Sequence, residues 1–93
     1  MKTTITFNKG KLNEEIFEIQ IPEFEGSEKQ IEWANQIFSE VVSGLCQMAS
    51  GKMTNENVKS QYDMILAKLS SQKSAKFWID NRSNNFQTIY KSL

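Results

Sequence analysis

Hydrophobic and polar positions alternate with a period of two near the N-terminal end of the chain and follow a helical period after it. Residues 3–7 alternate, and residues 16–21 alternate again with an apolar face opposite a polar one. Such alternation is typical of half-buried strands, so the pattern predicts a β-hairpin over residues 3–21. The apolar face of the second segment comprises Phe17, Ile19 and Ile21.

A proline and a capping motif mark the passage from strand to helix. Pro22 ends the hairpin because proline lacks the N–H that a strand ladder needs, and residues 22–26 are predicted to be a linker. Ser27 and Gln30 form a Ser-x-x-Gln capping box, which predicts a helix over about residues 27–50. Its expected apolar face comprises Ala34, Ile37, Phe38, Val41, Leu45, Met48 and Ala49.

Helical spacing continues to the end of the sequence. Thr54 is the expected N-cap of a second helix over residues 54–71. Residues 74–92 carry apolar positions at helical spacing, either as one helix or as two with a break near Ser83. The predicted fold class is α+β: an N-terminal β-hairpin followed by three or four α-helices, in a single small domain over residues 1–93.

Large side chains must dominate the core of so short a chain. Each large apolar side chain that is buried contributes roughly 1.5–3 kcal/mol, and the chain has ten aromatic residues. Loss of the Trp33 side chain is therefore expected to cost about 3–5 kcal/mol. The predicted core residues are Trp33, Ile37, Phe38, Tyr62, Leu66 and Trp78.

Charge is balanced overall but unevenly distributed. Residues 1–50 carry four lysines and eight acidic residues, a net charge of −4, whereas residues 51–93 carry six lysines, one arginine and three acidic residues, a net charge of +4. The asymmetry fits either solvated helix faces and an acidic strand edge, or two ends suited to partners of opposite charge. The candidate partner-binding residues are Glu14, Glu15, Glu18, Glu23 and Glu25.

The residue types needed for most catalytic and metal sites are missing. The chain has no histidine and a single cysteine, Cys46, which excludes a Ser-His-Asp triad, an imidazole ligand and an internal disulfide. We expect no enzyme activity, no cofactor and no metal. The lone cysteine, together with the absence of a signal-peptide pattern and of a long apolar segment, predicts a cytoplasmic protein that does not cross a membrane.

Basic residues in the last third of the chain offer a different interpretation. They lie beside aromatic residues, so they could neutralise phosphates while a ring stacks on a base. The sequence pI of about 6.3 is below the range typical of nucleic-acid modules, which leaves this as the alternative. The candidate nucleic-acid-binding residues are Lys73, Lys76, Arg82 and Lys91.

Asp80 and Arg82 are the most specific polar residues near the second tryptophan. Asp80 can accept a hydrogen bond from Trp33 or pair with a lysine, and Arg82 can form a fork with Glu28 or Glu32. Such contacts would clamp the two tryptophan-containing blocks together within the chain. Tryptophan and arginine also dominate interface hot spots, so an anchor for a partner is the second interpretation.

The two blocks, GSEKQIEWANQI and SAKFWIDNR, resemble small proteins carried by phages, plasmids and integrative elements of low-GC Gram-positive bacteria. Phe38 stands where that family usually has arginine. The first match runs through residues 21–30 and continues at Trp33, Ala34 and Ile37, and the second lies at Ala75, Lys76, Trp78, Ile79, Asp80 and Arg82.

The resemblance implies a protein that acts stoichiometrically on host machinery inside a bacterial host cell. We therefore expect a non-enzymatic protein–protein interaction module. The sharpest version is a phage or mobile-element inhibitor of a host defence complex, such as a CRISPR effector nuclease. Its expected partner is a host or phage protein complex, and a homodimer through the hairpin edge is compatible with it. The alternative is a small DNA- or RNA-binding accessory protein or regulator.

Overall fold

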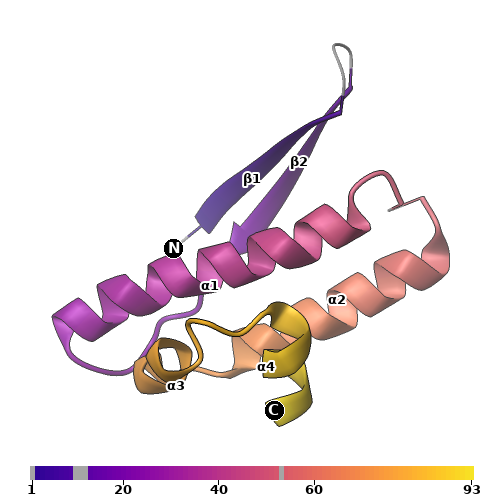
Figure 1. Cartoon of the computed structure of the whole chain (residues 1–93). Helices are drawn as coiled ribbons and strands as arrows, with labels where there is room; N and C mark the ends of the chain where they lie inside the picture. Colours follow the sequence, from indigo (N-terminus) through magenta and orange to yellow (C-terminus); the bar gives the residue numbers. More distant parts are fainter. Residues whose placement is uncertain (1, 10–12, 53) are drawn as a thin grey trace.

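Two strands and then four helices follow one another in the described residues of the computed structural model, which are 2–9, 13–52 and 54–93 (Figure 1). Side chains are described at 17–52 and 54–93. The expectation of one small, mostly helical domain with strand structure at its N-terminal end is confirmed. The elements are β1 (Lys2–Lys9), β2 (Asn13–Gln20), α1 (Glu28–Ala49), α2 (Glu56–Ser71), α3 (Ala75–Asp80) and α4 (Phe86–Ser92).

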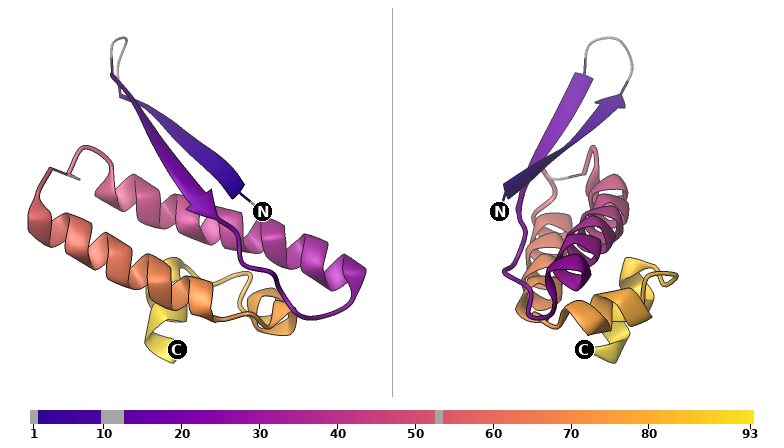
Figure 2. Two further views of the ribbon diagram at one scale, coloured as in Figure 1. Left: turned by 180° about the vertical axis from the view of Figure 1, so that it is seen from behind. Right: turned by 90° about the vertical axis from the view of Figure 1, so that its left-hand side faces the viewer.

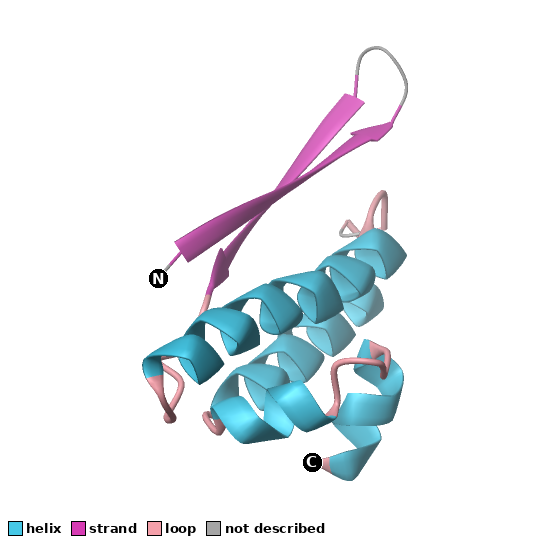
Figure 3. Cartoon of the chain, turned by 60° about the vertical axis from the view of Figure 1, so that its left-hand side comes forward, coloured by secondary structure: helices cyan, strands magenta, loops and turns pink. Residues whose placement is uncertain are grey.

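β1 and β2 pair antiparallel, with Ile5 opposite Phe17. The paired strands form a ribbon that leans away from the helices, so its far end stands clear of them (Figure 3). Phe17 and Ile19 are buried and Glu18 is exposed, as a strand with one apolar face requires. β2 thus attaches the ribbon to the helices through alternate side chains.

The start of α1 follows the predicted capping box. The Ser27 side chain accepts a hydrogen bond from the backbone N–H of Gln30, and the Gln30 side chain accepts one from the backbone N–H of Ser27. The predicted apolar face is buried except at Met48, where the prediction is wrong because that side chain is exposed. The buried residues of α1 are Ala34, Ile37, Phe38, Val41, Val42, Leu45, Cys46 and Ala49.

α2 begins one residue later than predicted. Asn55, rather than Thr54, is the N-cap, and its Oδ1 accepts hydrogen bonds from the backbone N–H groups of Asn57 and Val58. Asparagine and threonine are both good N-cap residues, so the sequence alone does not separate the two positions. Tyr62 is buried on the face of α2 that packs against Cys46 in α1.

The open question about residues 74–92 is settled in favour of two helices. Ser74 caps α3 through a hydrogen bond from the backbone N–H of Phe77, and Asn85 caps α4 through one from the backbone N–H of Thr88. Between the helices, the Asn81 side chain donates to the Phe77 carbonyl. Asparagine caps at both ends of the connection therefore produce the break.

The aromatic core centres on the second tryptophan block. Trp78 is fully buried, and its ring meets those of Phe38 and Phe24 edge-on at centroid distances of 5.2 and 6.2 Å. Its indole N–H donates to the Gln72 carbonyl at 2.9 Å, which satisfies the buried donor. Trp78 therefore joins α3 to α1 and to the linker.

The predicted core is correct except at its edges. Ile37, Phe38, Tyr62 and Trp78 are buried, and Leu66 is half-buried against them. The prediction for Trp33 is wrong: 46 % of this residue is exposed. Position 33 lies at the border of the apolar stripe of α1, and no other element of the described chain covers it fully.

The linker is held to the segment before α3. The Glu25 N–H donates to the Lys73 carbonyl at 2.7 Å, and the Glu25 carbonyl accepts from the Ala75 N–H at 3.0 Å. Phe24 is buried and packs against Phe38 of α1, with ring centroids 5.8 Å apart. These contacts fix the base of the hairpin at the α3 end of the helical layer.

Candidate partner-binding surface

The acidic candidates lie along β2 and the linker. Glu18, Glu23 and Glu25 are exposed, and none of them forms an ion pair with a described lysine or arginine. Strand alternation turns Glu18 away from the helices, and Glu23 and Glu25 flank the buried Phe24 in the same alternating way. Three carboxylates are thus presented to solvent along one continuous segment.

The remaining two acidic candidates are Glu14 and Glu15. Both belong to β2, where Glu14 lies opposite Asn8 and Glu15 opposite Phe7. Their side chains lie outside the described residues. The backbone register places them toward the end of the ribbon that stands clear of the helices.

The base of the hairpin is hollowed where it meets α2. This hollow has a volume of about 370 Å³, and Glu23 from the linker and Lys73 from the segment after α2 both line it. Its other lining residues are Gln20, Ile21, Pro22 and Ser70. One basic candidate therefore borders the acidic segment instead of joining the other basic residues.

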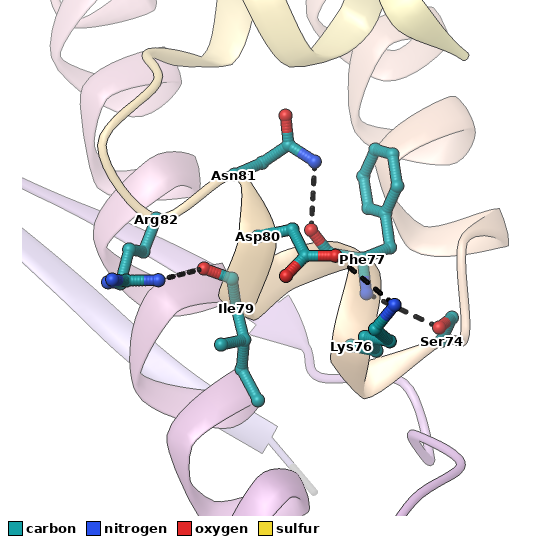
Figure 4. Close-up of polar contacts among 7 residues, drawn as sticks. All are labelled: Ser74, Lys76, Phe77, Ile79, Asp80, Asn81 and Arg82. Atoms are coloured by element: carbon teal, nitrogen blue, oxygen red, sulfur yellow. Dashed lines mark hydrogen bonds and ion pairs between the residues drawn. The ribbon is translucent and has the colours of Figure 1, made fainter.

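The basic candidates do not form one surface. Lys73 lines the hollow at the hairpin base, Arg82 lines a second hollow between α1 and the α3–α4 connection, and Lys91 lines a third between α2 and α4. Lys76 lies on α3 and pairs with Asp80 at 3.9 Å (Figure 4). A phosphate backbone that follows one groove would not meet all four.

Arg82 connects the second tryptophan block to Trp33 of the first. Its guanidinium lies 5.3 Å from the centroid of the Trp33 ring, and its Nη1 donates to the Ile79 carbonyl at 2.8 Å. Figure 4 shows Arg82 turned toward Ile79 and away from the Lys76–Asp80 pair. The expected fork with Glu28 or Glu32 is not among the ion pairs of the described residues, so a cation–π contact replaces it.

A third surface, between α2 and α4, was missed by the sequence analysis. It is a hollow of about 360 Å³ lined by Ile65, Phe86, Gln87, Tyr90 and Lys91. Its apolar residues follow helical spacing, which predicts a helix but does not show that the apolar face stays partly open. One signal was available in the sequence: Met64 is an apolar residue between the polar Asp63 and the apolar Ile65, and the structure leaves 57 % of it exposed.

Cys46 and Tyr62 form a buried pair, with Sγ and Oη 3.6 Å apart. Burial raises the pKa of the Cys46 thiol, although its hydrogen bond with Tyr62 acts in the opposite direction. Burial, followed by the hydrogen bond with Cys46, also raises the pKa of the Tyr62 hydroxyl. Both groups are neutral near pH 7, so this pair has no activated nucleophile.

No group of three potential metal-ligating side chains occurs in residues 2–9, 13–52 and 54–93. Within the same ranges, no helix combines the length and apolar character that crossing a bilayer requires.

Comparison with protein-family models, with curated proteins and with solved structures finds no match to the chain.

Proposed function

We propose that this protein is a non-enzymatic protein-binding module that engages its partner through the acidic segment of β2 and the linker. The observation that carries the proposal is the row of exposed carboxylates at Glu18, Glu23 and Glu25, which have no ion-pair partner among the described residues. Opposite charges across an interface steer encounter and set specificity. A basic protein surface is therefore the complementary partner.

The hairpin adds a second means of contact. In the described sheet, β1 is hydrogen-bonded to β2 alone, and the ribbon extends beyond the helical layer (Figure 1). An extended strand with one unpaired side can add to the sheet of a partner, and main-chain hydrogen bonds then contribute affinity. The acidic side chains would supply the charge selectivity that a strand edge lacks.

The resemblance to proteins of phages and mobile elements suggests which partner to test first. We propose a host defence complex, such as a CRISPR effector nuclease, whose nucleic-acid groove is basic. An acidic segment in such a groove would compete with the nucleic acid for the same cations.

The test is capture of partners from bacterial host lysate by tagged protein, with and without nuclease, read by mass spectrometry. The variant Glu18→Gln, Glu23→Gln, Glu25→Gln removes three carboxylates without changing side-chain length. The matched control, Glu32→Gln, Glu40→Gln, Glu56→Gln, removes three exposed carboxylates from α1 and α2. We expect a stoichiometric protein that survives nuclease, is retained by the control and is lost with the acidic-segment variant.

Equal capture by both variants would contradict the role of the acidic segment. Recovery that disappears with nuclease would instead favour the nucleic-acid-binding alternative. Circular dichroism of both variants checks that each one remains folded, because exposed glutamates contribute little to stability.

A further inference from the structure

The surface between α2 and α4 combines an apolar floor with a basic rim. Phe86 and Tyr90, one turn apart on α4, face Ile65 of α2 across a hollow of about 360 Å³. That volume is at the small end of the range for ligand pockets, which suits one or two apolar side chains. We name this surface the α2–α4 groove; the residues that line or border it are Ile65, Lys68, Phe86, Gln87, Tyr90 and Lys91.

Two lysines border the groove. Lys68 places its Nζ 4.9 Å from the centroid of the Tyr90 ring, and Lys91 lines the hollow directly. Neither lysine forms an ion pair with a carboxylate in the described part of the chain. Both ammonium groups are thus available to an incoming anion.

The surroundings of the groove leave this positive charge uncompensated. α4 contains no acidic residue, and the acidic Asp80 of α3 is already paired with Lys76. On α2, Asp63 lies on a different stripe from Met64 and Lys68, which are one turn apart. The charge pattern therefore favours a ligand that carries carboxylates.

An exposed methionine precedes the lining residue Ile65 on α2. Met64 is 57 % exposed, more than any other large hydrophobic residue whose side chain the structure describes. Methionine is flexible and polarisable, so it adapts to apolar groups of different shape. Its position one turn before Lys68 places apolar contact and positive charge side by side along α2.

We propose that the α2–α4 groove binds a peptide segment of a partner protein in which a large apolar side chain is flanked by carboxylates. The apolar side chain would occupy the hollow over Phe86 and Tyr90, and the carboxylates would meet Lys68 and Lys91. This mode matches the known binding of amphipathic segments in apolar grooves with charged rims.

This surface is separate from the acidic segment of the proposed function. α1 contacts both β1 and α4 and lies between the hairpin and the C-terminal helix (Figure 2). The protein could therefore bind a basic protein surface through its acidic segment and an acidic peptide through the α2–α4 groove. Peptide binding by the groove does not require partner binding by the acidic segment.

A direct binding measurement tests the groove. The probe is a short fluorescein-labelled peptide with a central phenylalanine flanked on both sides by glutamates, and binding is followed by fluorescence anisotropy. We expect saturable binding that weakens about fivefold in Lys68→Gln, Lys91→Gln, because each exposed charge pair contributes little alone. The control Lys52→Gln, Lys59→Gln removes two exposed lysines elsewhere and should bind as the unmodified protein does.

Amide chemical shifts locate the bound peptide. With ¹⁵N-labelled protein, the largest changes are expected at Met64, Lys68, Phe86 and Tyr90, and Met64→Gln should weaken binding while the fold is kept. Equal loss of affinity in the groove and control variants, or shifts centred elsewhere, would overturn the proposal. So would the absence of saturable binding.

Competing occupants give distinct results. A single-stranded oligonucleotide that displaces the peptide with higher affinity would assign the groove to nucleic acid instead. Concentration-dependent shifts at the same residues without peptide, accompanied by a rise in mass by analytical ultracentrifugation, would assign it to a second copy of the chain. Failure of the Glu18→Gln, Glu23→Gln, Glu25→Gln capture experiment would leave all of these results unchanged.

Discussion

Trp78 and Trp33 occupy similar sequence settings, each with charged neighbours and an adjacent apolar residue, yet their environments differ. Trp78 is fully buried among Phe24 and Phe38, and its indole N–H is hydrogen-bonded. Trp33 is 46 % exposed and is covered on one face by Arg82. Whether a large apolar residue is buried in the core depends more on its position on the helix than on its size.

The difference follows from what lies opposite each helix. α3 packs one face against α1 and the linker, and on that face Trp78 meets the rings of Phe38 and Phe24. α1 is long, and Trp33 stands at the border of its apolar stripe. The only partner for its ring that the described structure records is the side chain of Arg82.

Trp78→Ala should have the largest effect on stability. Truncation of a buried aromatic residue leaves a cavity, and we expect a loss of about 3–5 kcal/mol in the free energy of unfolding. Urea denaturation followed by circular dichroism measures it. A loss below that of Trp33→Ala would reverse the comparison between the two residues.

Gly26→Ala tests the close approach of Gly26 to the Ala75 side chain of α3. Gly26 has φ of 154°, and an added Cβ would lie 2.8 Å from Gln30 Oε1 and 3.1 Å from the Ala75 Cβ. The substitution strains the backbone and disturbs the capping box, so we expect a loss of about 2 kcal/mol in the free energy of unfolding. Gly44→Ala is the control, because its Cβ would meet Phe86 at an ordinary 3.6 Å and alanine favours helix. Equal destabilisation by both changes would contradict this explanation.

Trp33→Ala should cost much less than Trp78→Ala. About half of Trp33 stays exposed in the folded protein. We therefore expect the free energy of unfolding to fall by about 1 kcal/mol, through the loss of partial apolar burial and of the cation–π contact. Thermal or urea unfolding of the variant measures it. A loss as large as 3–5 kcal/mol would restore the expectation drawn from sequence that Trp33 is core.

The smallest expected effect is the coupling between Trp33 and Arg82. A double-mutant cycle with Trp33→Ala and Arg82→Ala should give a coupling energy of about 0.5–1 kcal/mol. The parallel cycle with Lys76→Ala serves as control, because Lys76 pairs with Asp80 and has no recorded contact with Trp33. Equal coupling in both cycles would show that the Arg82 contact is not specific.

Local signals predicted most helix boundaries. The capping box at Ser27 and the cap at Ser74 are side-chain-to-backbone hydrogen bonds within one turn, and such bonds depend on nearby sequence alone. Thr54 and Asn55 are adjacent and both suit an N-cap, so the sequence placed the start of α2 only to within one residue. The break after α3 likewise depends on the contacts of Asn81 and Asn85.

Surfaces were harder to predict, because they depend on which elements become neighbours. The exposed state of Glu18, Glu23 and Glu25 follows from strand alternation and charge. The separation of Lys73 from Lys91 cannot be derived from such local patterns, because it is determined by the packing of α4 against α2. The α2–α4 groove was missed for the same reason: helical spacing alone does not distinguish a covered stripe from a partly open one.

The backbone contacts of Glu25 with Lys73 and Ala75 also bear on the order in which the chain assembles. They close a loop that contains both long helices, and the entropy of closing such a loop must be lost before the contacts form. α1 and α2 are neighbours in sequence and can pair first, whereas these two bonds of the linker form only once residues 73–75 are in place. During synthesis, the linker would therefore be fixed only after residues 73–75 have been made, although it precedes both long helices in the chain.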